Sequence, residues 1–208
     1  MKQKILIIGQ PRSGTSSLLN NICKQDYVRI SEPYNYSFGE RYEWPLKELK
    51  SDRVAIKSLV VQIPSKEKSK GCMHFVEFSK LVDRVILLKR NNQQEHFESL
   101  LNLHYRLLQD NKINSHKKYV FDGLLFSKIP KGLITKIEEL QQNSLEDITE
   151  VSEKLNIQPT SYEDLYGEDR MKSFEIINKW DLDLDPFELN EALHPQHRYR
   201  QFTDKNLL

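Results

Sequence analysis

Short apolar runs alternate along this chain with longer segments in which apolar residues recur every three or four positions. The short runs are rich in β-branched residues and predict strands at Lys4–Ile8, Tyr27–Ile30, Arg53–Lys57, Arg84–Leu88 and Ile157–Ser161. The longer segments predict helices at Gly14–Lys24, Met73–Val82, Gln93–Asp110, Ile134–Leu155, Arg170–Trp180 and Pro186–Leu193. Such alternation is typical of an α/β domain, so we predict a three-layer fold with a central parallel sheet of about five strands flanked by helices.

Two segments do not follow this pattern. Asn111–Lys131 mixes aromatic residues with a glycine, and we expect it to cover the sheet edge or to form part of a binding site. Residues 195–208 are basic and are expected to form a flexible tail or a short closing segment. The length of 208 residues suits one domain, so residues 1–208 are interpreted as a single unit.

The most informative segment is the first strand with the loop and helix that follow it. The apolar run Ile5–Ile8 stops at Gly9, and a tight turn leads through Gly14 into a helix. A strand, a glycine-bounded loop and a helix start direct backbone N–H groups and the positive end of a helix at one point. The spacing of the glycines fits the nucleoside-triphosphate loop, but Thr15 stands where that loop has Lys, and a cation lies inside the loop at Arg12. We therefore expect a phosphate-like group to bind here.

The loop Pro-Arg-Ser-Gly-Thr-Ser-Ser at 11–17 resembles the phosphosulfate-binding loop of sulfotransferases. The resemblance implies a P-loop NTPase-like fold and 3′-phosphoadenosine 5′-phosphosulfate as donor, with 3′-phosphoadenosine 5′-phosphate as product and no metal required. The pattern is closest to bacterial carbohydrate (trehalose-type) and nodulation-type sulfotransferases. The donor-binding residues implied in this loop are Pro11, Arg12, Ser13, Gly14, Thr15, Ser16 and Ser17.

Charged residues follow two further predicted strands, at the edge where ligands of open α/β sheets bind. Glu32 begins a Glu-Pro-Tyr-Asn segment similar to one in carbohydrate sulfotransferases, where the Glu is the proposed base. A Glu at this place also fits a simple ion pair with Arg12 or Lys57, and both roles are compatible. Lys57 resembles the Lys of a Val-Lys-Thr segment and, with Arg12, would offset charge on the leaving phosphate.

The resemblance continues after the fourth predicted strand. Arg90 and Ser99 match, at the longer spacing, the Arg and Ser with which sulfotransferases hold the 3′-phosphate of the donor. The later segment Tyr-Glu-Asp-Leu at 162–165 also has a counterpart in the family. We interpret that segment as structural, with its acids capping the helix that begins at Arg170. His104 is the reserve candidate for the base, whereas His96 is expected to be packed or solvated.

Composition and charge narrow the function classes. The formal net charge is +1, so nothing favours nucleic acid as a partner. No apolar run reaches the length of a membrane span or forms a signal peptide, and two cysteines make no disulfide framework. We expect a cytoplasmic protein without an integral membrane segment. The six histidines show no metal-ligand spacing.

The sequence thus predicts transfer of a sulfuryl group to the hydroxyl of a carbohydrate or small molecule. Aromatic residues after Glu32 are candidates for stacking on that acceptor: Tyr34, Tyr36, Phe38, Tyr42 and Trp44. One alternative is a P-loop nucleotide kinase or NTPase, although the Lys after Gly14 and an acid after Leu88 are missing. The other alternative is a non-catalytic nucleotide-binding module.

Overall fold

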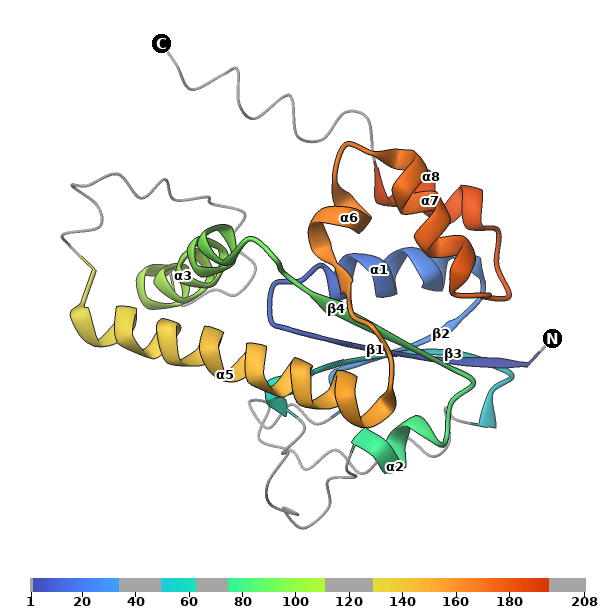
Figure 1. Ribbon diagram of the computed structural model, residues 1–208, viewed down its shortest axis with the longest axis horizontal. Helices are drawn as coiled ribbons and strands as arrows, with labels where there is room; N and C mark the ends of the chain where they lie inside the picture. The colour runs from blue at the N-terminus through green and yellow to red at the C-terminus, as the bar shows by residue number, and fades with distance from the viewer. Residues whose placement is uncertain (1, 34–49, 63–74, 111–128, 195–208) are drawn as a thin grey trace.

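A computed structural model describes residues 2–33, 50–62, 75–110 and 129–194 of the chain (Figure 1). Its strands are β1 (Gln3–Gly9), β2 (Val28–Ser31), β3 (Arg53–Leu59), β4 (Arg84–Lys89) and β5 (Thr160–Ser161). Its α-helices are α1 (Thr15–Ile22), α2 (Phe75–Ser79), α3 (Gln93–Asp110), α5 (Lys131–Leu155), α6 (Tyr162–Tyr166), α7 (Arg170–Lys179) and α8 (Pro186–Leu193). Two 3₁₀ turns, η1 (Cys23–Gln25) and η4 (Val60–Gln62), extend α1 and β3.

The five described strands form one parallel sheet in the order β2-β3-β1-β4-β5. This confirms the predicted α/β class and the parallel sheet. Because the chain leaves β1 for β2 and β3 on one side, and then crosses to β4 and β5 on the other, the strand order reverses at β1. In open α/β sheets, ligands bind in the crevice at the carboxyl ends of the strands beside such a reversal. The loop after β1 lies at this point.

Two hydrophobic cores cover the two faces of the sheet, because side chains alternate along each strand. In Figure 1, α1, α6, α7 and α8 lie above the sheet, and α2 and α5 lie below it. The upper core contains Ile5, Ile7, Leu18, Leu19, Ile22, Ala55, Leu165, Ile177 and Leu189. The lower core contains Leu6, Ile8, Val54, Ile56, Phe75, Phe78, Leu87, Ile148 and Val151. Near-continuous apolar strands are what a sheet covered on both faces requires.

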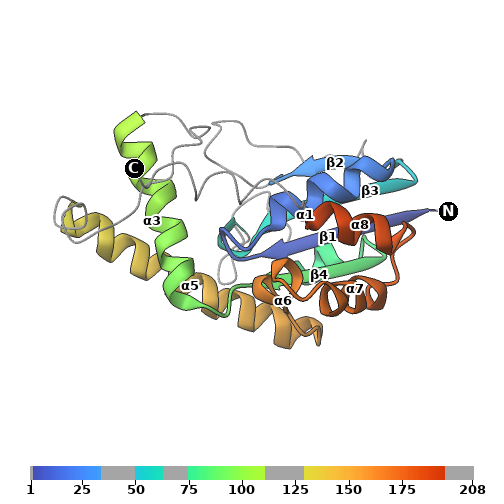
Figure 2. The same ribbon diagram turned by 90° about the horizontal axis from the view of Figure 1, so that it is seen from above.

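Helix α3 lies beyond the carboxyl ends of the strands, where it packs against the N-terminal half of α5 (Figures 1 and 2). A third cluster, which includes Leu100, Leu101 and Ile137, joins these two helices. One half of the long α5 therefore covers the lower face of the sheet, and the other half packs against α3. This arrangement places the start of α3 beside the loop after β1.

Several predicted boundaries differ from the structure. The predicted strand Ile157–Ser161 is reduced to Thr160–Ser161, since this edge strand pairs only with the last two residues of β4. The predicted helix at Met73–Val82 is the shorter α2 in its described part. Helix α6 was not predicted, because five residues are too few to show helical periodicity. The segments 111–128 and 195–208, and the aromatic residues after Glu32, lie outside the described residues.

Candidate functional site

The loop between β1 and α1 makes a tight turn at the carboxyl edge of the sheet. The N–H of Gln10 donates to the Leu88 carbonyl at 3.1 Å, and the Ser13 hydroxyl donates to the Gln10 carbonyl at 2.7 Å. Arg12 and Gly14 both have left-handed backbone conformations, with φ of 65° and 82°. Gly14 is the N-cap of α1 and provides no side chain to satisfy the first N–H groups of the helix. The N-terminus of α1, with N–H groups that no side chain caps, therefore opens onto this loop, and the binding of an anion there stays a prediction.

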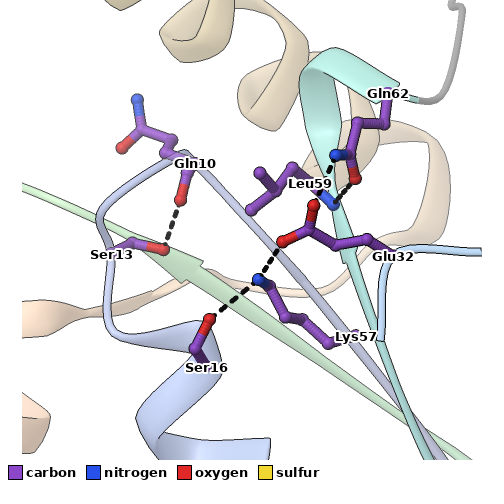
Figure 3. A network of polar contacts seen from close by, with 7 residues as sticks. All are labelled: Gln10, Ser13, Ser16, Glu32, Lys57, Leu59 and Gln62. Atoms are coloured by element: carbon purple, nitrogen blue, oxygen red, sulfur yellow. Dashed lines mark hydrogen bonds and ion pairs between the residues drawn. The ribbon is translucent and has the colours of Figure 1, made fainter. Parts of the chain in front are cut away.

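Lys57 brings a buried cation to the base of this loop. The residue is 4% exposed and lies on the sheet face that α1 covers. Its Nζ donates to the Ser16 hydroxyl at 2.8 Å and forms an ion pair with the Glu32 carboxylate (Figure 3). The predicted loop, base and cation therefore meet at one point. The ion pair suggested for Glu32 forms with Lys57.

The Glu32 carboxylate is held in one orientation by two strands. Its backbone has φ of 53°, and its N–H donates to the Lys57 carbonyl at 2.8 Å, so the chain turns sharply as β2 ends. Its second carboxylate oxygen accepts a hydrogen bond from Gln62 Nε2 at 2.8 Å. The Leu59 N–H donates to Gln62 Oε1 at 3.1 Å and thereby fixes the amide (Figure 3). Gln62 was not predicted, because nothing in the sequence marks a Gln just beyond β3.

Arg90 lies at the end of β4, on the other side of β1. The residue is 8% exposed, and its guanidinium lies 4.0 Å from the centre of the Tyr162 ring. One guanidinium nitrogen donates to the Glu95 carbonyl at 3.1 Å, while Nε has no hydrogen-bond partner among the described residues. Its backbone N–H donates to Gln10 Oε1 at 2.8 Å, which ties this strand end to the loop after β1. Arg90 is thus a desolvated cation at the same edge.

The two other candidates on α3 have different surroundings. Ser99, which was paired with Arg90 in the sequence analysis, accepts a hydrogen bond from Arg12 Nε at 3.1 Å. Ser99 therefore contacts the loop after β1 directly. His104 is partly buried and lies near Lys136 of α5. Burial lowers the pKa of its imidazole most, and the positive charge of Lys136 lowers it further. The described contacts connect His104 to α5 and not to Glu32.

His96 is fully buried beneath the loop and supports it. Its Nε2 lies 2.8 Å from the Pro11 carbonyl, and its Nδ1 has no partner among the described residues. Burial lowers the pKa of this imidazole, and the nearby Arg90 guanidinium lowers it further, against the opposing effects of Pro11 and Glu163. A neutral ring with its proton on Nε2 fits this arrangement, since it donates to the carbonyl. His96 is packed, as the sequence predicted.

Helix α6 contacts the same loop from above. The Tyr166 hydroxyl donates to the Gly14 carbonyl at 2.8 Å, and its ring stacks with Tyr162 at a centroid distance of 4.8 Å. A Cβ on Gly14 would lie 2.5 Å from the Tyr166 ring, so this contact requires glycine as well as its positive φ. The prediction that the acids of this segment cap the following helix was wrong. Asp169 caps α7 instead, because it directly precedes that helix.

Known protein families and curated proteins offer no match to this chain. Among residues 2–33, 50–62, 75–110 and 129–194, no group of three or more His, Cys, Asp or Glu side chains is arranged to hold a metal. None of the helices in these ranges is long and apolar enough to cross a membrane.

The buried ion pair leads to a stability prediction. Replacing Lys57 by Met should lower the free energy of unfolding by about 2 kcal/mol, because a half-buried carboxylate and a hydroxyl lose their donor. Chemical denaturation measures this change. As a control, Lys2→Met removes an exposed ion pair with Asp52 and should cost less than about 0.5 kcal/mol. Equal effects of the two substitutions would contradict the account of Lys57.

The buried imidazole leads to a pH prediction. His96 has a lowered pKa in the folded state, whereas the unfolded chain restores it towards 6.5. The unfolded state therefore binds more protons as the pH falls below that value, and stability falls with it, by at most about 1.4 kcal/mol per pH unit. His96→Gln keeps an N–H donor for Pro11 but cannot titrate. Denaturation across the pH range from neutral to mildly acidic should show a smaller slope for this variant, and identical slopes would contradict the prediction.

Proposed function

We propose that this protein is a sulfotransferase that moves a sulfuryl group from 3′-phosphoadenosine 5′-phosphosulfate to an acceptor hydroxyl. The observation that carries the proposal is the buried Lys57 ammonium, which bridges the Ser16 hydroxyl and the Glu32 carboxylate at the loop after β1. This contact combines an anion-binding loop, a fixed cation and a base within one hydrogen-bonded group. The resemblance of residues 11–17 to the phosphosulfate loop supports the same conclusion.

The chemistry around Ser16 favours sulfuryl transfer over phosphoryl transfer from a nucleoside triphosphate. In P-loop NTPases, the loop Ser or Thr hydroxyl and an acidic side chain hold Mg²⁺ against the phosphates. Here a lysine ammonium donates to both kinds of group, the Ser16 hydroxyl and the Glu32 carboxylate. A single positive charge matches a leaving 5′-phosphate whose charge grows as the sulfur–oxygen bond breaks. The scheme requires no metal.

The donor would bind across the β1 end of the sheet. Backbone N–H groups of Ser13–Ser16, together with Arg12, would hold the 5′-phosphosulfate at the α1 N-terminus. Arg90 is desolvated, and its Nε has no hydrogen-bond partner in the part of the chain that the structure describes. It would bind the 3′-phosphate, because a guanidinium donates two parallel hydrogen bonds to such a group. Ser99 lies next to Arg12 and would complete the ring of donors around the phosphates.

The reaction would proceed by direct transfer between two oxygens. The acceptor hydroxyl oxygen attacks the sulfur, the bond from sulfur to the bridging oxygen breaks, and 3′-phosphoadenosine 5′-phosphate leaves. Glu32 takes the proton of the acceptor hydroxyl. Lys57, which pairs with Glu32 in the free protein, would turn towards the bridging oxygen when the donor arrives. The movement of Lys57 would release the Glu32 carboxylate to act as a base. The same lysine would then stabilise the leaving group. The acceptor is a carbohydrate or small molecule.

Nucleotide binding tests the donor assignment. The 3′-phosphoadenosine 5′-phosphate product should raise the thermal midpoint of the protein, and at a hundredfold excess over its Kd it adds about 2.7 kcal/mol. ADP, and ATP with Mg²⁺, should give smaller shifts, since they carry no 3′-phosphate. Arg90→Ala should abolish the preference, whereas Arg84→Ala, at the far end of β4, should keep it. A larger shift with ATP and Mg²⁺ would favour a kinase or NTPase instead.

Turnover tests the base. Glu32→Gln should leave nucleotide binding intact and lower turnover by about two to four orders of magnitude, the usual contribution of a general base. The assay measures 3′-phosphoadenosine 5′-phosphate released from the donor in the presence of sugars, phenols and alcohols. Glu150→Gln, which removes a carboxylate paired with a lysine on α5, is the control and should retain full turnover. Near-normal turnover of Glu32→Gln would move the base elsewhere, first to His104.

A further inference from the structure

The turn between β4 and α3 is held by a carboxylate from a distant part of the chain. One Glu163 oxygen accepts a hydrogen bond from the Asn91 N–H at 3.0 Å, and the other accepts one from the Asn92 N–H at 3.1 Å. These two residues directly follow Arg90. A carboxylate that takes two adjacent backbone N–H groups fixes the peptide planes between them, so Glu163 restrains the backbone that carries Arg90.

The residues beside Glu163 contact the other parts of the nucleotide site. The ring of Tyr162, one residue before it, lies 4.0 Å from the Arg90 guanidinium carbon. The hydroxyl of Tyr166, three residues after it, donates to the Gly14 carbonyl. Helix α6 therefore contacts both the loop after β1 and the end of β4. Within α6, Glu163 binds the backbone just after the end of β4.

The charge of Glu163 also decides where an anion can bind. Burial opposes ionisation of this carboxyl, but the hydrogen bonds from Asn91 and Asn92 and the nearby Arg90 outweigh it and lower its pKa. Glu163 is therefore ionised at neutral pH and occupies N–H groups at the start of α3 that would otherwise attract a phosphate. The cation nearest to this turn is Arg90, whose buried Nε has no hydrogen-bond partner among the described residues.

We propose that Glu163 is a positioning residue that gives the site its selectivity for a 3′-phosphorylated nucleotide. This inference rests on the proposed function, and it adds a residue that touches no part of the nucleotide. Glu163 acts in two ways. It fixes the backbone that places Arg90 against Tyr162, and it accepts hydrogen bonds from the Asn91 and Asn92 N–H groups, which are then not available to a phosphate. Without it, the 3′-phosphate loses a fixed partner, while groups that bind the 5′-phosphate around Gly14 are unchanged.

The test is the affinity for two nucleotides, measured by calorimetric titration at neutral pH. Glu163→Ala should weaken binding of 3′-phosphoadenosine 5′-phosphate about tenfold, as expected for loss of charge-assisted hydrogen bonds, and should change ADP binding less than about twofold. Glu163→Gln keeps one carbonyl oxygen for an N–H donor and should have an intermediate effect. Asp164→Asn is the matched control, because this neighbouring acid pairs with Lys172, and it should alter neither affinity.

The outcomes separate this inference from the function on which it rests. A wild-type protein that binds both nucleotides equally would overturn the sulfotransferase assignment and, with it, any selectivity set by Glu163. A wild-type preference that survives in Glu163→Gln and Glu163→Ala would overturn the role of Glu163 alone. An equal loss for both nucleotides would also overturn it, since that result indicates a purely structural residue. Should the alanine variant fail to fold, the glutamine variant decides between these outcomes.

Discussion

The burial of one lysine ammonium is the constraint on which the candidate site depends. Removing the charge of Lys57 from water is costly, and the structure offsets this cost with a carboxylate and a hydroxyl from two other elements. To supply them, Glu32 must adopt a left-handed conformation directly after β2, and α1 must begin just before Ser16. Two strands and a helix are therefore placed relative to one another by one hydrogen-bonded group.

The sheet topology explains why these groups meet. Lys57 and Glu32 come from β3 and β2, on one side of β1, whereas Arg90 comes from β4, on the other side. The strand order reverses at β1, so the loop after β1 lies between these two sides. His96, beneath the Pro11 carbonyl, and Gln10, which accepts the Arg90 N–H, connect the two sides.

Much of this fold could be predicted from the sequence, because both sheet faces are covered and the central strands β1, β3 and β4 consequently contain long apolar runs. Helix α3 was predicted with its observed bounds, since its apolar face is long and regular. The two-residue β5 and the five-residue α6 were predicted poorly, since tertiary contacts rather than periodicity define them. Glu32 and the loop were found in the sequence because they follow predicted strands, and Lys57 because it ends one; in the structure Lys57 lies within β3, two residues before its end. No local sequence pattern reveals contacts between distant parts of the chain. Such contacts with backbone groups or another side chain define the roles of Gln62, Glu163 and Tyr166.

The central claim is that Lys57 supplies the cation of the site. The most direct measurement is the dissociation constant of 3′-phosphoadenosine 5′-phosphate, determined once with excess Mg²⁺ and once with an excess of a chelator. With a built-in ammonium in contact with Ser16, the two values should agree within about twofold, because no metal contributes to binding. Binding that appears only when Mg²⁺ is present would contradict the account and assign the site to metal-dependent phosphoryl chemistry.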